Sequence, residues 1–119
     1  MAKTSQIETD PRWGAVSWTD ASGNLWLFGG QSGLAFLNDL WEFDTGAKTW
    51  TQVPVGGYNQ NGTYGTQGAG STSNLPGGRV LATARYDASS NVLWLFGGYG
   101  HDATHGSNGE LNDLWEYQP

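Results

Sequence analysis

Two histidines and two carboxylates lie close together near the C-terminal end of the sequence. His101 and His105 are four residues apart, with Asp102 and Glu110 nearby. Imidazole and carboxylate groups bind divalent metals when they converge on one point. A spacing of four residues brings side chains together on a helix, but this stretch is rich in Gly, Ser and Asn, which favour a loop. We therefore expect a solvated loop here, with no metal and no cofactor.

Four ring-bearing side chains in expected loops are the candidates for ligand binding. The long segment 54–78, rich in Gly, Asn, Gln, Thr and Ser, carries Tyr58 and Tyr64, and Tyr99 and His101 follow the second apolar run. Segment 54–78 is either a plain surface connection or a binding loop whose rings stack on a ligand, such as a carbohydrate or a peptide.

The composition gives no support for catalysis or for several classes of binding partner. The chain has no cysteine, and no Ser-His-Asp set, phosphate loop or paired-carboxylate site can be assembled, so we expect no enzyme activity. A net charge of −6 argues against nucleic acid and anionic membranes as partners. No apolar run is long enough to cross a bilayer and residues 1–10 lack the core of a signal peptide, so we expect a soluble protein of undetermined location.

The candidate loops must be positioned by two copies of one repeated pattern. Leu25-Trp-Leu-Phe-Gly-Gly30 returns as Leu93-Trp-Leu-Phe-Gly-Gly98, and residues 37–43 return as 111–117. The short apolar runs read as buried strands that end at the glycine pair. We expect one unit over 11–53, with strands at 12–18, 25–28, 39–43 and 49–53, and a second over 79–119 that stops after its third strand.

The first unit resembles the kelch motif. An apolar run ends in Gly29-Gly30, the aromatic Phe43 follows, and Trp50 comes seven residues after it. The resemblance implies four-stranded antiparallel blades, usually six or seven to a ring. The expected fold class is therefore all-β, with two four-stranded kelch-like propeller blades per chain.

The second unit lacks the Trp that follows the aromatic in the first. When the N-terminus is written after the C-terminus, Ala2-Lys3-Thr4 aligns with Ala47-Lys48-Thr49. We therefore expect residues 1–10 to supply the fourth strand to a blade of a neighbouring chain. The residues expected to carry this assembly are Thr4, Ile7, Trp115 and Tyr117. The alternative is a chance match in a tag.

Two blades cannot close a ring and would leave apolar faces bare. We expect the chain to assemble with itself, as a homotrimer with six blades or, alternatively, a homotetramer with eight. The expected function is that of a self-assembling propeller fragment, natural or engineered. The alternative is a module that binds a carbohydrate or peptide through loops on one face of the ring.

Polar residues recur at matching places in the two units. Arg12 and Arg79 recur at the start of the first strands, and Asp39 and Asp113 at the start of the third strands. We expect each Arg to tie adjacent strands together rather than to face a ligand. Further expectations concern smaller features: Asn38 and Asn112 cap loops, Asp20 and Asp87 bind their own turns, and one of Trp13 and Trp18 is exposed.

Overall fold

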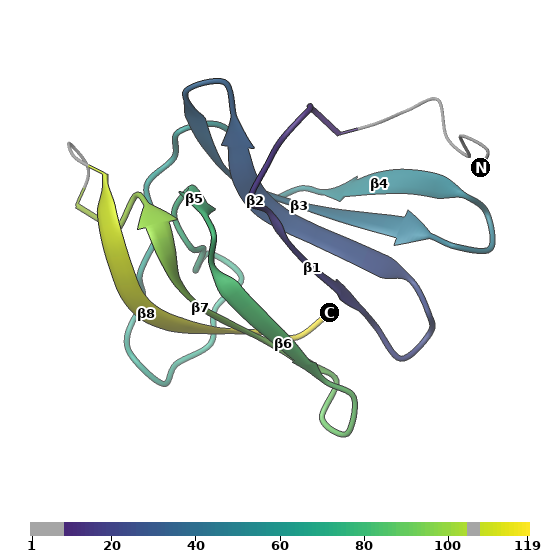
Figure 1. Ribbon diagram of the computed structural model, residues 1–119. Coiled ribbons are helices and arrows are strands. Elements are labelled where there is room, and N and C mark those ends of the chain that lie inside the picture. The colour runs from purple at the N-terminus through teal and green to yellow at the C-terminus, as the bar shows by residue number, and fades with distance from the viewer. Residues whose placement is uncertain (1–8, 105–107) are drawn as a thin grey trace.

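The chain folds into two antiparallel β-sheets that lie side by side, as expected of an all-β protein (Figure 1). The computed structural model describes residues 9–104 and 108–119. Over those residues every regular element is a strand, and no helix is available to span a membrane.

The first sheet, called blade 1, has four strands in chain order, so each strand pairs with the next one along the chain. Hairpins of this kind follow from short apolar runs separated by Asp, Gly and Asn turns. The strands are β1 (Val16–Thr19), β2 (Leu25–Ser32), β3 (Ala35–Asp44) and β4 (Thr49–Val53). The last of these matches the expected range, whereas β1 starts later than expected because Trp13 makes only an isolated bridge to Gln31.

The second sheet, blade 2, has three strand positions. Its edge consists of two short strands that both pair with the central strand and are separated at Leu81, whose φ is +60°. The strands are β5 (Arg79–Val80), β6 (Thr83–Asp87), β7 (Val92–Gly100) and β8 (Gly109–Tyr117). Within the described residues nothing pairs with the outer edge of β8. A four-stranded second blade is therefore not complete in this part of the chain.

The glycine pairs do not end their strands, which corrects the expectation from sequence. β2 continues to Ser32 and β7 to Gly100, and the pairing register shifts between Phe28 and Gly30 and between Phe96 and Gly98. This is a β-bulge, which needs backbone angles that a side chain opposes. Gly29 has a φ of +67°, and a Cβ there would lie 2.9 Å from the Arg79 carbonyl oxygen.

The hydrophobic core lies between the two sheets. One face of blade 1 packs on one face of blade 2, and we call this contact the inner seam. In it Trp18 and Trp26 stack with ring centroids 5.7 Å apart, and Tyr117 of blade 2 lies 6.2 Å from Trp26. Blade 1 contributes Val16, Trp18, Trp26, Phe28 and Leu40, and blade 2 contributes Ala82, Ala84, Tyr86, Leu93, Leu95, Trp115 and Tyr117.

Acidic residues hold the turns, as expected. Asp20 accepts hydrogen bonds from the backbone N–H of Ser22 and Asn24 and from Nε1 of Trp26. Burial alone raises the pKa of Asp20, but these hydrogen bonds outweigh burial and lower the pKa. Asp87 accepts from Ser89 in the corresponding turn of blade 2.

The long segment 54–78 is anchored to blade 1 by a buried amide. Asn38 is fully buried; its Oδ1 accepts from Gly57 N–H and its Nδ2 donates to the Pro76 carbonyl. The segment therefore returns to the same side chain at both ends. This confirms that Asn38 caps the loop.

Candidate functional site

The most extensive candidate site is a pair of sheet faces that point away from the inner seam. In a strand, alternate side chains point to opposite faces, so each blade has a second face. We call these the outward faces. The cross-strand register places Ser17, Leu25, Leu27, Trp41, Phe43 and Trp50 on the outward face of blade 1. It places Thr83, Arg85, Trp94, Phe96, Leu114 and Glu116 on that of blade 2.

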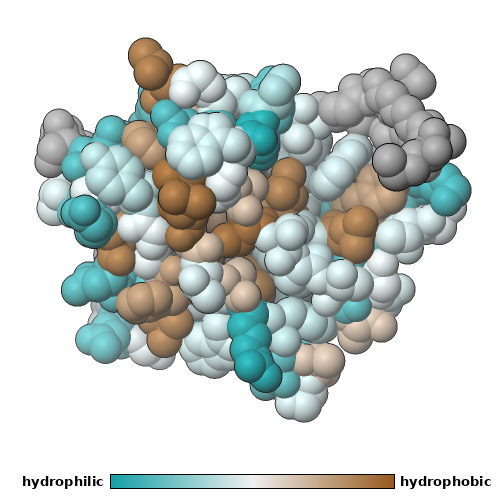
Figure 2. Space-filling model, in the orientation of Figure 1, coloured by the Kyte–Doolittle hydropathy of each residue, from teal (hydrophilic) through white to brown (hydrophobic). Residues whose placement is uncertain are grey.

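The outward face of blade 2 exposes residues whose blade 1 counterparts are buried. Phe96 is 51% exposed and Leu114 is 63% exposed, whereas Phe28 and Leu40 are 6% and 4% exposed. Figure 2 shows several apolar patches among hydrophilic residues on the face in view. Exposed apolar surface of this kind is typical of an interaction site.

The outer edge of β8 adds backbone groups to this candidate site. Trp115 and Tyr117, two of the expected assembly residues, lie on β8 and send their side chains into the inner seam. Burial and the negative charge of Glu42 raise the pKa of Tyr117. Thr4 and Ile7, the other two expected assembly residues, lie outside the described residues.

The repeated arginines form ion pairs that tie strands together, as expected. Arg12 binds both carboxylate oxygens of Asp39, at 2.6 and 2.9 Å, and Arg79 binds both oxygens of Asp113, at 2.6 and 2.8 Å. Each arginine also donates to the carbonyl of the first bulge glycine, Gly29 or Gly97. Each contact is bidentate. It holds β5 in blade 2, and the segment before β1 in blade 1, to the second and third strand positions of the same blade.

Tyr64 belongs to the second of these ion-pair clusters rather than to an open ligand site. Its hydroxyl donates to Asp113, and its ring packs edge-on against Trp115 at 4.9 Å. Burial and the adjacent carboxylate raise the pKa of Tyr64 to about 12. Burial alone raises the pKa of Asp113, but hydrogen bonds from Arg79, Tyr64 and Trp115 outweigh burial and hold it at about 2. Tyr64 thereby fastens the long segment to blade 2.

Two of the other ligand candidates, Tyr99 and His101, come together around Phe36. The Phe36 ring lies 5.7 Å from Tyr99 and 5.6 Å from His101. Both ring nitrogens of His101 are buried, with no hydrogen-bond partner in the described part of the chain. Tyr58 is exposed, and its backbone bridges to Leu37, next to Phe36. The structure therefore separates Tyr64 from the other three candidates.

No group of three or more metal-binding side chains occurs within residues 9–104 and 108–119. His105, the second histidine of the candidate metal set, lies outside these residues. Asp102 accepts from the backbone and hydroxyl of Thr104, in the same loop.

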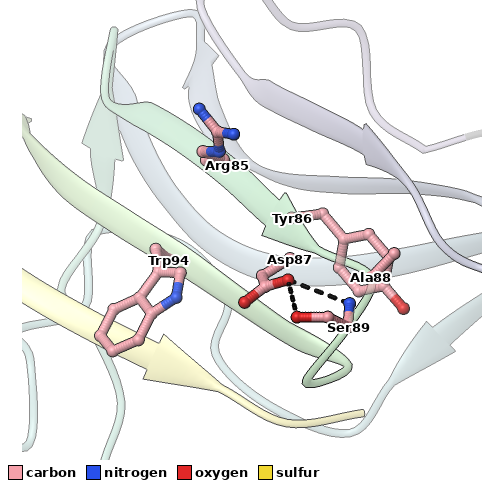
Figure 3. A pocket seen from close by; sticks show the side chains of 6 residues that line it. All are labelled: Arg85, Tyr86, Asp87, Ala88, Ser89 and Trp94. Carbon is pink, nitrogen blue, oxygen red and sulfur yellow. Dashed lines mark hydrogen bonds between the residues drawn. The ribbon is translucent and has the colours of Figure 1, made fainter.

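A shallow hollow lies at one end of the outward face of blade 2. It is lined by Arg85, Tyr86, Asp87, Ala88, Ser89 and Trp94. Figure 3 shows Arg85 and Trp94 apart from each other on neighbouring strands, with Asp87 bound to Ser89. The hollow is therefore formed by side chains of the second repeat.

Sequence reasoning missed the connections that the long segment makes across the fold. Neither the Phe36 cluster nor the contact between Tyr64 and Asp113 was expected. Tyr64 and Asp113 are 49 positions apart in the sequence, and no local spacing pattern indicates a contact between residues so far apart.

Comparison with known proteins supports the blade assignment. No curated protein matches the chain. Residues 22–54, which run from the turn before β2 to the end of β4, match the family model described as the Kelch motif. The resemblance to the kelch motif is therefore confirmed for this part of the chain.

Proposed function

We propose that this propeller fragment functions by assembling with further copies of itself into a closed ring of blades, without catalysis. One observation carries the proposal. The large apolar residues of the central and third strands on each outward face match those of a face that is packed inside the chain.

The outward face of blade 2 corresponds to the blade 1 side of the inner seam. Trp94 matches Trp26, Phe96 matches Phe28 and Leu114 matches Leu40. All three blade 1 residues are buried against blade 2. Burying their counterparts contributes favourable hydrophobic free energy, in the range of about 1.5–3 kcal/mol for each fully buried side chain.

The outward face of blade 1 corresponds in turn to the blade 2 side of the inner seam. Leu27 matches Leu95, Trp41 matches Trp115 and Phe43 matches Tyr117. Blade 2 of one copy therefore fits blade 1 of the next, as blade 1 fits blade 2 within a copy. A repeated contact between two different faces closes into a ring when the rotation permits. Three copies give six blades, which we favour, and four give eight.

The outer edge of β8 fits the same proposal. In blade 1 the corresponding strand, β3, pairs with β4 from Asp44 to Leu40. We propose that residues 1–10 of a neighbouring copy, through Thr4 and Ile7, occupy the equivalent place beside Trp115 and Tyr117. An occupied edge also protects the blade from uncontrolled strand pairing.

The test is the native mass of the chain and of two variants in solution. Phe96→Asp places a charge in the centre of the outward face of blade 2, so we expect it to reduce the assembly to single chains. Leu34→Asp is the matched control, because Leu34 is 92% exposed at the turn between β2 and β3, away from both outward faces. Circular dichroism verifies that both variants fold. A wild-type chain that remains monomeric at micromolar concentration contradicts the proposal.

A second candidate function is ligand binding near Phe36. The observation that favours it is the exposed ring of Tyr99, which packs on Phe36. His101 also packs on Phe36, and its ring nitrogens have no hydrogen-bond partner among the described residues. Rings arranged in this way could stack on a sugar or contact a peptide. The test is a glycan array and a peptide library with the wild-type chain and Tyr99→Ala. Binding that Tyr99→Ala abolishes supports the candidate, and no binding by the wild-type chain contradicts it.

A further inference from the structure

The hollow beside Trp94 marks a difference between two otherwise equivalent positions in the blades. In blade 1, Trp26 is paired across the strands with Trp18, and the two rings stack at an interplanar angle of 10°. In blade 2 the residue paired with Trp94 is Arg85. Figure 3 shows that the Arg85 guanidinium does not lie over the Trp94 ring. One face of the Trp94 ring is therefore open, whereas the equivalent face of the Trp26 ring is covered by Trp18.

The inner seam shows which side chains cover the equivalent place in blade 1. Tyr117 packs on Trp26, and the hydroxyl of Tyr86 accepts a hydrogen bond from the backbone N–H of Ala21. Ala21 is the counterpart of Ala88, which lines the hollow. Two tyrosines of blade 2 thus close the corresponding site of blade 1.

The outward face of blade 1 carries one aromatic counterpart of these tyrosines. Phe43 corresponds to Tyr117, whereas Thr19 corresponds to Tyr86. The Phe43 ring is half-buried and lies 5.1 Å from Trp50, which holds it on the outward face. A ring that is already held in place loses little conformational entropy when it binds.

From these relationships we infer that Phe43 of a second copy packs against Trp94 in this hollow and forms the principal contact between copies. The inference rests on the proposed self-assembly, and it identifies the two residues that make the main contact between copies. Aromatic anchors that become fully buried in a pocket of an interface carry a large share of binding energy. We expect Trp94→Ala or Phe43→Ala to weaken association at least about tenfold, the effect of losing one such anchor.

The contact joins two different faces, which a mixing experiment can detect. Trp94→Asp damages only the blade 2 face and Phe43→Asp only the blade 1 face, so each variant alone should be monomeric. Mixed together, the two variants share one intact contact, between Trp94 of the Phe43→Asp chain and Phe43 of the Trp94→Asp chain. The expected product is a one-to-one dimer by native mass spectrometry, with no ring.

The outcomes separate the two proposals. A wild-type chain that forms a ring while the mixture gives no dimer would overturn the Phe43–Trp94 contact and leave the proposed ring intact. Self-association of Phe43→Asp alone would also overturn the contact, because it would indicate pairing of like faces. A monomeric wild-type chain contradicts both proposals.

Discussion

Arg79 and Asp113 join the first and third strand positions of blade 2 through two hydrogen bonds, of 2.6 and 2.8 Å. The Arg79 side chain is almost wholly buried and also donates from Nε to the Gly77 carbonyl. The Arg12–Asp39 pair repeats this arrangement in blade 1. The same contact thus organises both repeats, whatever their differences in loop length.

Removal of one member of this pair should destabilise blade 2 strongly. We expect Arg79→Ala to lower the free energy of unfolding by about 3 kcal/mol, because Asp113 then keeps its charge in a largely buried place without a cation. Urea denaturation at a fixed protein concentration measures the effect, since assembly also contributes to stability. The double variant Arg79→Ala with Asp113→Ala should lose less than the sum of the two single variants. Additive losses would show that the pair is not coupled.

The same cluster should limit stability at both ends of the pH scale. Asp113 has a pKa of about 2 when folded, below its ordinary value of 3.8, so its contribution is present above pH 4 and is lost as the pH falls towards 2. Tyr64 has a pKa of about 12 when folded, above its ordinary value of 10.0, so its contribution is present below pH 10 and is lost between pH 10 and 12.

Tyr64→Phe isolates these effects, because it removes the hydroxyl and keeps the ring beside Trp115. Melting temperatures across pH should show the wild-type advantage over this variant shrinking as the pH rises from 10 to 12. The wild-type advantage should also shrink as the pH falls from 4 towards 2, because Asp113 has one donor fewer in the variant and therefore a smaller lowering of its pKa to lose. Identical pH profiles would contradict the role of the Tyr64–Asp113 hydrogen bond.

The bulge in β7 should tolerate no side chain at its first glycine. Gly97 has a φ of +67°, and a Cβ there would lie 2.9 Å from the Leu111 carbonyl oxygen. We expect Gly97→Ala to cost about 1–3 kcal/mol through backbone strain and this close contact. Gly109→Ala is the matched control in β8, because a Cβ there meets nothing within 4 Å. Equal thermal stability of the two variants would show that the bulge adapts to a side chain.

The blade pattern was visible in the sequence because its determinants are local. Leu25 to Phe28 and Leu93 to Phe96 fix the central strands, and Phe43 and Trp50 face each other across β3 and β4, as the kelch resemblance implies. Strand limits were less predictable, since the glycine pair Gly29-Gly30 forms a bulge inside β2. A glycine pair is compatible with both a strand end and a bulge.

The candidate sites depended on contacts that sequence patterns do not encode. Tyr58 and Tyr64 look alike in a polar loop, yet Tyr64 is bound to Asp113 while Tyr58 is exposed. Trp13 and Trp18 also look alike, and the structure buries Trp18 and exposes Trp13, which confirms that one of the pair is exposed. In both cases the deciding factor is the neighbouring blade, which no local spacing specifies.

Deletion of residues 1–7 tests whether the N-terminal segment contributes to assembly. If this segment pairs with β8 of a neighbouring copy, its loss exposes the N–H and C=O groups along the edge from Leu111 to Tyr117 and should leave monomers or aggregates. Light scattering at several concentrations measures the result. The substitution Ile7→Ala keeps the backbone pairing and removes one apolar side chain, so it should weaken the assembly less than the deletion. A truncated chain that still forms the wild-type ring would show that the outward faces alone hold the copies together.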